Sequence, residues 1–143
     1  MLVIPVLAGE FRPRQLTRAH PDDAGYDLCA VEFVRLSAGR RELVPTGVQL
    51  AIPEGYVGLI CPRSGLALKK GVTVLNAPGI VDAGYRGDVG VVLANFGDEA
   101  IWIEPGDAVA QLLIVQLTPI TFLATPELPD SARSTGGFGS TGT

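Results

Sequence analysis

Short apolar runs separated by glycine and proline make up most of this chain. Eighteen glycines and eleven prolines divide the sequence into β-branched stretches, a spacing typical of a β-sandwich or barrel. The predicted strands cover residues 42–52, 56–61, 71–75, 89–94, 100–103 and 108–117. We therefore expect an all-β fold of the distorted barrel or sandwich type.

Helical signals are confined to one short stretch. Residues 64–70 are predicted to form a turn or two of helix, which Gly71 would end. Fixed-period repeats are missing, so nothing indicates a repeat architecture. We predict one all-β domain over residues 1–123, followed over residues 124–143 by a proline-containing linker and a glycine-rich arm.

Composition and charge narrow the function classes. A length of 143 residues with 47% hydrophobic and 18% charged residues fits one globular domain. The formal charge of −4 argues against broad nucleic-acid binding. Apolar runs fall short of the ~18 residues of a membrane span, and residues 1–9 do not resemble a signal peptide. We expect a cytoplasmic protein that binds neither nucleic acid nor membrane.

Several kinds of catalysis lack the residues they need. His20 is the only histidine and lies among turn residues, so a Ser-His-Asp triad is disfavoured. Cys29 and Cys61 are far from a C-x-x-C spacing, which disfavours zinc and suits two buried, reduced thiols. Arg40-Arg41 and Lys69-Lys70 are too short for a basic patch. Any catalysis must use carboxylates, hydroxyls and arginines, with or without a hard metal ion.

Polar groups of this kind gather at two turns. Asp27 follows a glycine turn in Ala-Gly-Tyr-Asp-Leu, where an ordinary turn residue is the simpler interpretation. Arg63, Ser64 and the Gly65 N–H come together where a strand gives way to the predicted helix. Such a group is suited to binding an anion. The equally simple alternative is that Ser64 is a helix cap beside a solvated arginine.

Residues 76–88 read as an elaborated hairpin tip between two strands. The extended stretch Gly79–Val81 offers backbone groups for the edge of a nucleobase, with Asn76 as a side-chain partner. Asp82 would then lie near the sugar and phosphates, able to orient or deprotonate water, while Tyr85 would pack flat against the sugar. Taken alone, Asp-Ala-Gly-Tyr is more simply interpreted as a plain turn.

The C-terminal third adds two further features. Gln111 is the single polar residue in an apolar strand, so it is either a structural bridge or a group directed at a ligand. The segment 133–143 holds one cation, one aromatic residue, five hydroxyls and four glycines. It suits wrapping a polyanion, although a frayed end is the simpler interpretation.

Together these five segments resemble the five motifs of the trimeric dUTP diphosphatases, the dUTPases. They read AGYDL, PRSGLA, GIVDAGYRG, GDxxAQL and RxxGGFGSTG, in this order between residues 24 and 142. The resemblance implies a jelly-roll-like fold and a homotrimer whose three active sites are shared between subunits. A flexible C-terminal arm would close a neighbour's site. The implied reaction converts dUTP to dUMP and pyrophosphate, which keeps uracil out of DNA and supplies dUMP for thymidylate synthesis.

The resemblance also implies individual roles. Asp82 would be the catalytic carboxylate that orients water, and Asp27 would hold Mg²⁺ through water. The substrate-binding residues that it implies are Arg63, Ser64, Gly65, Asn76, Gly79, Ile80, Val81, Tyr85, Gly90, Gln111, Arg133, Phe138, Gly139, Ser140 and Thr141. The phosphate chain would contact Arg63 and Ser64, the uracil edge would pair with residues 79–81 and 90, and Phe138 would stack on the base.

Two departures from the family pattern accompany this match. Ser134 stands where the fifth motif usually has glycine, and Gly90 lacks a side chain that many relatives carry. Neither removes a reacting group. A dCTP deaminase of the same fold would need a glutamate in residues 89–95, where there is none. A non-catalytic module would be expected to lack Asp82, Arg63 or the arm, and a plain structural β-domain would have no affinity for nucleotides.

Overall fold

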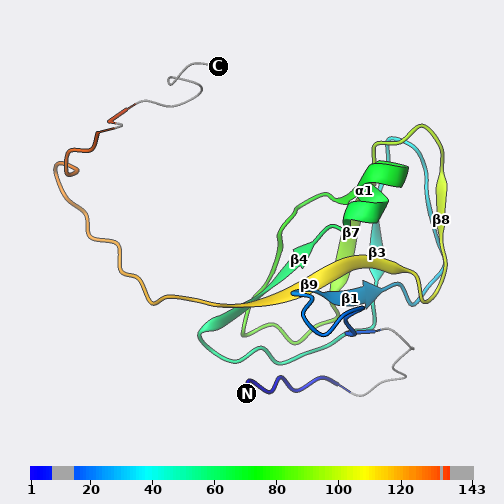
Figure 1. The fold of residues 1–143 in the computed structure, drawn as a ribbon, viewed down its shortest axis with the longest axis horizontal. Helices are drawn as coiled ribbons and strands as arrows, with labels where there is room; N and C mark the ends of the chain where they lie inside the picture. Colours follow the sequence, from blue (N-terminus) through cyan, green and yellow to red (C-terminus); the bar gives the residue numbers. More distant parts are fainter. Residues whose placement is uncertain (8–14, 133, 136–143) are drawn as a thin grey trace.

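Nine short strands and one helix form the described part of the chain. A computed structural model describes residues 1–7, 15–132 and 134–135. The elements are β1 (Tyr26–Cys29), β2 (Val34–Leu36), β3 (Arg41–Pro45), β4 (Tyr56–Cys61), α1 (Ser64–Lys70), β5 (Val72–Val74), β6 (Gly79–Val81), β7 (Gly90–Asn95), β8 (Ile101–Ile103) and β9 (Ala108–Gln116). Figure 1 shows their arrangement. The predicted all-β class is confirmed.

The strands form three antiparallel sheets. The largest has the order β1-β9-β4-β6, a second has the order β3-β7-β5, and β2 pairs with β8 in a two-stranded ribbon. Strand β9 is the longest and pairs with β1 on one side and β4 on the other. Segments far apart in the sequence therefore meet on one sheet.

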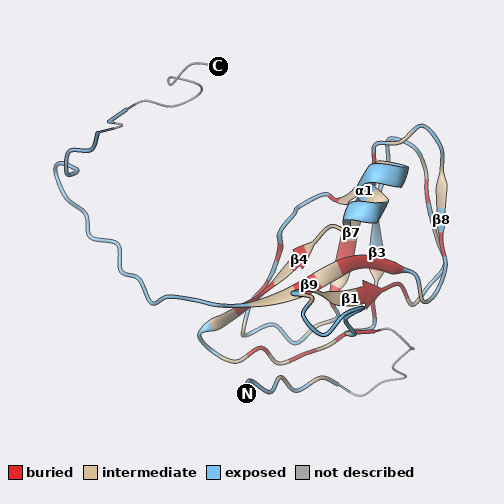
Figure 2. Ribbon diagram, viewed as in Figure 1, coloured by how far each residue is buried: buried red, intermediate tan, exposed pale blue. Residues whose placement is uncertain are grey.

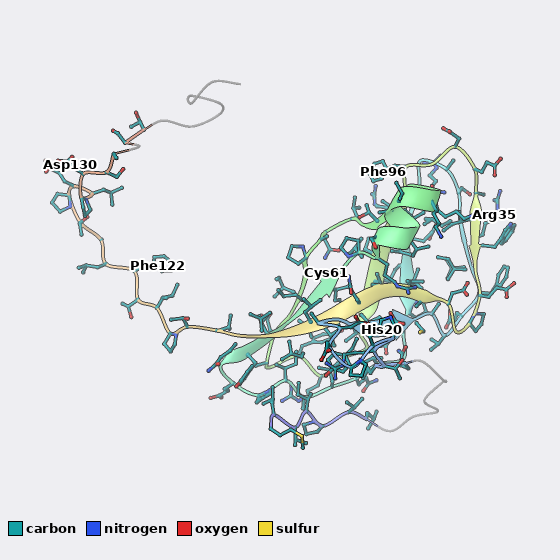
Figure 3. All side chains as sticks on the ribbon, in the orientation of Figure 1. His20, Arg35, Cys61, Phe96, Phe122 and Asp130 are labelled. Carbon is teal, nitrogen blue, oxygen red and sulfur yellow. The ribbon has the colours of Figure 1, made fainter. Side chains whose placement is uncertain are left out.

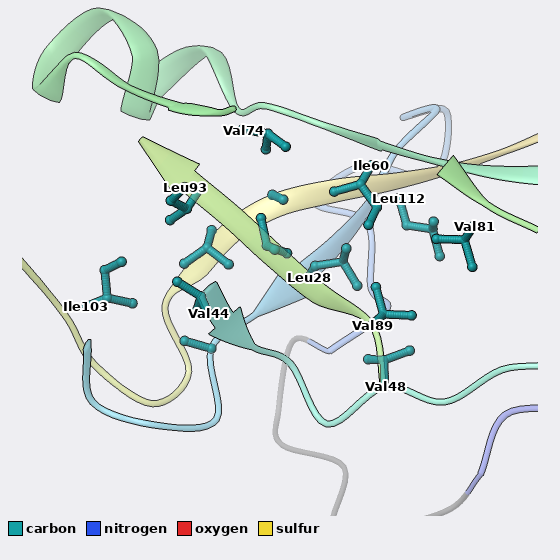
Figure 4. Packing of buried hydrophobic residues seen from close by; sticks show 14 of the residues in the cluster. Leu28, Val44, Val48, Ile60, Val74, Val81, Val89, Leu93, Ile103 and Leu112 are labelled. Carbon is teal, nitrogen blue, oxygen red and sulfur yellow. The ribbon is translucent and has the colours of Figure 1, made fainter. Parts of the chain in front are cut away.

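The hydrophobic core lies between the two larger sheets. Side chains of alternate residues point to the same face of a strand, and the inward positions of both sheets are apolar and buried (Figures 2 and 4). The four-stranded sheet contributes Leu28, Ile60, Val81 and Leu112, the three-stranded sheet contributes Val44, Val74, Val91 and Leu93, and the ribbon contributes Leu36 and Ile103. Each such side chain stabilises the fold by about 1.5–3 kcal/mol.

Most predicted strands agree with the structure, but one is wrong over half its length. The strand expected over residues 42–52 ends at Pro45. Proline has no N–H for the ladder, and Gly47 follows with a φ of 67°, outside the strand region. Val48 and Ile52 remain buried without a continuous ladder, which explains why the apolar pattern continued.

Helix α1 matches the prediction in extent and in its end. Gly71 adopts the left-handed conformation with a φ of 65°, and its N–H donates to the carbonyl of Ala67. A side chain at this position would bring a Cβ to 2.8 Å from the Gly97 nitrogen, so only glycine fits. The helix cap is Arg63, without a side-chain cap bond, so the alternative with Ser64 as the cap is wrong. In the described ranges, the structure has no helix with the length and hydropathy to cross a membrane.

The chain leaves the body of the fold after β9. The Leu117 N–H still donates to the Gly55 carbonyl at 2.8 Å. Residues 118–132 then contain neither strand nor helix and run away from the sheets (Figures 1 and 3). Four apolar side chains of this segment are 71–91% exposed: Ile120, Phe122, Leu123 and Leu128. The division into residues 1–123 and 124–143 stays a prediction.

Asn95 is a buried polar residue at the end of β7. It is 1% exposed. Its side-chain amide donates to the carbonyls of Leu36 and Glu99 at 3.1 and 2.9 Å, and its carbonyl accepts from the Gly97 N–H at 2.9 Å. The side chain thus connects β7 with β2 and with the turn that leads to β8.

Replacing Asn95 by leucine should lower the free energy of unfolding by about 2–4 kcal/mol, since each buried polar group left without a partner costs about 1–3 kcal/mol. Urea denaturation at fixed protein concentration measures the change. Glu42→Gln, an exposed change on β3, is the control and should stay within about 0.5 kcal/mol of the parent. Equal stability of the two variants would contradict this role of Asn95.

Candidate active site

Two predicted site residues, Asp27 and Gln111, form a row with Cys61 across the four-stranded sheet. Gln111 on β9 is the register partner of Asp27 on β1 and of Cys61 on β4. Directly paired residues point to the same face of a sheet. Their neighbours Leu28, Leu112 and Ile60 point to the core. The row therefore lies on the face opposite the core.

Arg63 connects the ends of three strands. Its Nε lies 3.5 Å from Oδ1 of Asp27, and its Nη1 donates to the Ala108 carbonyl at 2.7 Å. The two side chains are 35% and 17% exposed, respectively. Such a half-buried pair is screened less than a surface pair. Arg63 thus holds Asp27 beside the start of α1.

Gln111 is half-buried, although a buried position was predicted, and its side chain bridges to the loop that follows β4. Its Nε2 donates to the Pro62 carbonyl at 3.0 Å. The side chain passes over Gly25, where an added Cβ would lie 2.3 Å from Oε1 of Gln111. The contact with Pro62 favours the structural-bridge alternative, and the absence of a side chain at position 25 allows the close approach.

A hollow of about 750 Å³ opens over this row; we call it the phosphate hollow. Its lining includes the predicted residues Asp27, Arg63, Ser64, Gly65 and Gln111, together with Asp23, Cys61, Lys69 and Lys70. Gly65 is exposed, and a Cβ built there meets nothing within 4 Å. Packing within the chain therefore does not require glycine at this position.

A second hollow of about 180 Å³ lies beside β6; we call it the nucleoside hollow. Its lining brings together the predicted residues Asn76, Gly79, Ile80, Val81, Asp82, Tyr85 and Gly90. Strand β6 pairs with β4 along one side and is the edge strand of its sheet. Its other side thus presents backbone donors and acceptors without a neighbouring strand.

Tyr85 is oriented by contacts within its own turn. Its hydroxyl donates to the Asp88 carbonyl at 2.8 Å, and its N–H donates to the Asp82 carbonyl at 3.0 Å. The ring passes over Gly87, where a Cβ would lie 2.5 Å from the hydroxyl. The ring is 46% exposed at the wall of the nucleoside hollow. An exposed aromatic face held in this way is suited to packing against a ligand.

The two hollows have no lining residue in common. The adjacent residues Ile60 and Cys61 of β4 line different hollows, and adjacent strand residues point to opposite faces. Asp82 and Arg63 therefore line different hollows of the single chain. Five predicted residues lie outside the described ranges: Arg133, Phe138, Gly139, Ser140 and Thr141.

The described residues include the histidine and both cysteines, on which the arguments against a Ser-His-Asp triad and a zinc site depended. His20 is exposed, and its backbone N–H donates to a carboxylate oxygen of Asp23 at 2.8 Å. Both cysteines are free thiols, but Cys61 is half-buried and lines the phosphate hollow, so the expectation of two buried thiols was wrong for it. The described ranges contain no group of three or more His, Cys, Asp or Glu able to hold a metal. Within these ranges, Asp27 thus has at most one further residue of this kind beside it as a metal ligand.

Sequence reasoning missed Asp23, Lys69 and Lys70 as lining of the phosphate hollow. The two lysines had been set aside as too few for a basic patch. One signal could have identified Lys69: it lies four residues after Gly65 on the predicted helix, so the two residues share a face of that helix.

Known proteins identify the family. The sequence matches the dUTPase family over residues 14–142, most of its length. The deoxyuridine 5'-triphosphate nucleotidohydrolase of Leifsonia xyli subsp. xyli is 50% identical over 140 residues, which are 97% of this chain and 90% of the relative. The chain belongs to the dUTPase family.

Solved dUTPase structures are similar over the whole chain. A mutant dUTPase of Staphylococcus bacteriophage 80alpha, solved with dUpNHpp, has a TM-score of 0.87 and 28% identity, with all of both chains covered. A mutant dUTPase of phage phi11 of S. aureus, described with a structural Mg(II) ion, has a TM-score of 0.76 and 29% identity over 88% of this chain and 98% of that one. The predicted jelly-roll-like dUTPase fold is confirmed.

Gly25→Ala should destabilise this dUTPase by about 1–3 kcal/mol, the usual cost of inserting a methyl group into a filled space. The added Cβ would displace Gln111 from the Pro62 carbonyl. Gly65→Ala is the matched control because its Cβ meets open space, and it should stay within about 0.5 kcal/mol. Thermal unfolding of both variants measures the difference, and equal stability would contradict the described position of Gln111.

Proposed function

We propose that this chain hydrolyses dUTP to dUMP and pyrophosphate, with the nucleoside hollow binding deoxyuridine and the phosphate hollow binding the triphosphate. The proposal rests on the different functional groups that line the two hollows in this member of the dUTPase family. One has an edge strand, an amide and an aromatic face, and the other has cations, a hydroxyl and a free glycine N–H. These are the groups that a base with its sugar and a phosphate chain require.

Uracil selection rests on the edge of β6. Backbone groups of Gly79–Val81, the side chain of Asn76 and the strand at Gly90 pair with the uracil edge. Cytosine has a donor where uracil has an acceptor, and a site built for one such partner rejects the other by orders of magnitude. Tyr85 packs against deoxyribose and leaves no room for a ribose 2′-hydroxyl.

Asp82 activates the attacking water. It lies directly after β6, exposed and within the lining of the nucleoside hollow. Its carboxylate accepts a hydrogen bond from the water and takes up the proton as the water oxygen bonds to the α-phosphorus. The bond from that phosphorus to the bridging oxygen breaks, and pyrophosphate leaves with the electron pair. Positioning in line contributes most of the acceleration.

The phosphate chain binds at the start of α1. Arg63 keeps guanidinium donors beyond those used on Asp27 and Ala108. Ser64 and the Gly65 N–H add neutral donors. Gln111 uses one amide N–H on the Pro62 carbonyl and keeps its second N–H and its Oε1 for the phosphates or metal-bound waters. Because these donors are held in place before the substrate binds, little reorganisation opposes charge dispersal over the phosphate oxygens.

Magnesium completes the phosphate hollow. The donor set fits an ion held mainly by substrate phosphates and water, because Asp27 is the only predicted carboxylate ligand there and Mg²⁺ prefers this arrangement to an all-protein cage. The bound ion neutralises negative charge on the phosphates. The Arg63–Asp27 pair keeps the Asp27 carboxylate directed at the hollow whether or not the ion is bound.

The enzyme acts as a homotrimer in which one subunit's nucleoside hollow faces another's phosphate hollow. Two observations support this assembly. The nucleoside hollow, at about 180 Å³, is smaller than the roughly 300–1,000 Å³ of a complete ligand site. The four apolar side chains of residues 118–132 are almost fully exposed in the single chain, and a second copy would cover them.

The C-terminal arm closes the shared site. Residues 118–132 extend away from the body that carries the hollows (Figure 3), which fits an arm that serves a neighbour. Arg133, Gly139, Ser140 and Thr141 would contact the terminal phosphate, and Phe138 would stack on uracil. We place the enzyme in the cytoplasm, where its free thiols would stay reduced.

Pyrophosphate release from dUTP, dCTP, dTTP and UTP, measured side by side with Mg²⁺, tests the proposed function. We expect rapid release from dUTP and at least about 100-fold lower kcat/KM for the other three. Cytosine would leave buried hydrogen-bonding groups mispaired, thymine would add a methyl group at the base, and the ribose 2′-hydroxyl of UTP would clash with Tyr85. Comparable release from dCTP would contradict uracil selection at β6.

Asp82→Asn is the control variant for the same assay. It should bind dUTP as tightly as the parent while kcat falls by about 100- to 10,000-fold, the contribution expected of a general base. Near-normal turnover would reject Asp82 as the group that activates water.

Mixed trimers test whether the site is shared. Asp82→Asn damages one hollow and Arg63→Met the other, so each variant alone should be inactive. Equal mixing with unfolding and refolding should restore roughly a quarter of the parent activity, because each half of a shared site is intact with even odds. If each site were contained in one subunit, mixing the two variants would restore no activity.

A further inference from the structure

Two lysines of the phosphate hollow have no part in the chemistry above. Lys69 and Lys70 occupy the last turn of α1, are exposed, and line the hollow beside Ser64 and Gly65. Among the described residues, neither ammonium forms an ion pair or hydrogen bond. Their positive charge is therefore uncompensated within the part of the chain that the structure describes.

Arg63 is differently placed, because part of its hydrogen-bonding capacity is used within the protein. Its Nε lies beside Asp27 and its Nη1 donates to the Ala108 carbonyl. Asp23 and Asp27 also line the hollow and add negative charge. A triphosphate entering this hollow needs cations beyond Arg63, and the two lysines are the further cations that the described lining offers.

Positions on α1 place the two lysines on different sides of the helix. Lys69 lies four residues after Gly65, so it shares a face that opens to the phosphate hollow. Lys70 lies four residues after Leu66 and also borders a third hollow, distinct from the nucleoside hollow and lined by Arg63 as well. The pair thus spans the rim of the phosphate hollow at the end of α1.

We propose that Lys69 and Lys70 are substrate-positioning cations that bind the outer phosphates of dUTP and so favour the triphosphate over the monophosphate product. This proposal rests on the proposed function. The overall charge of −4 repels a polyanion, so local cations at the rim are needed to capture it. After cleavage, dUMP lacks the outer phosphates and gains nothing from the lysines, which assists its release.

Steady-state kinetics of Lys69→Gln, Lys70→Gln and the double variant test the proposal. Each single change should raise KM for dUTP by about fivefold, as expected for one partly exposed charge contact, and the double change by about 20-fold. The value of kcat should stay within about twofold, because these contacts are equal in ground and transition states. The inhibition constant of dUMP should change by less than about twofold, and Lys→Arg variants should restore KM.

Lysines in the last turn of a helix also stabilise it through the helix dipole, and the experiment separates the two roles. Damage to α1 alone would weaken dUTP and dUMP binding equally and would overturn the proposal. Arg41→Gln removes an exposed cation of β3 outside both hollows, and it should leave KM unchanged. An unchanged KM in the double lysine variant would likewise overturn the proposal.

A failure of the proposed function has a different outcome. If the parent protein releases no pyrophosphate from dUTP, that function is wrong, and calorimetric titration with inorganic pyrophosphate still tests the lysines. Loss of pyrophosphate binding in the double variant would support their role as phosphate-binding cations. Equal binding by the parent and the double variant would overturn it.

Discussion

The pairing of β9 with both β1 and β4 is the interaction on which the rest of the structure depends. It places Gln111 between Asp27 and Cys61 and directs the neighbouring Leu112 into the core. Because side chains alternate along a strand, a shift of one residue would exchange the polar row and the apolar face. The same register therefore builds the core and one half of the proposed active site.

Close approaches between backbone and side chains hold the site in shape. Gln111 can cross Gly25, and the Tyr85 ring can lie on Gly87, because neither glycine has a Cβ. Gly71 ends α1 against the backbone at Gly97, which sets the direction of the strand that follows. Gly65 is different, since it has open space around it. Packing within the described chain does not require glycine there, and in the proposed function the missing side chain gives the phosphate chain access to the N–H.

The separation of the two hollows explains the extended C-terminal segment and the proposed trimer together. A single chain carries the residues predicted to bind the base in one hollow and those predicted to bind phosphate in another. It also leaves Phe122 and Leu128 in solvent. Association of copies would join complementary halves and cover these apolar side chains, so the assembly that stabilises the fold would also create the catalytic site.

The sequence by itself determined the all-β class, the extent of α1 and the dUTPase motifs, because alternation, glycine signals and motif spacing are local properties of the chain. It predicted a strand past Pro45, since the apolar pattern continues to Ile52 while the hydrogen-bonded ladder does not. Only the tertiary structure decided that Asp82 and Arg63 lie in separate hollows and that Lys69 and Lys70 line one of them. The assignment of Asp82 and Arg63 to different hollows depends on strand register, which joins residues distant in sequence and which no local pattern encodes. Helical spacing relates Lys69 to Gly65, but only the fold brings that face of α1 to Asp27 and Gln111.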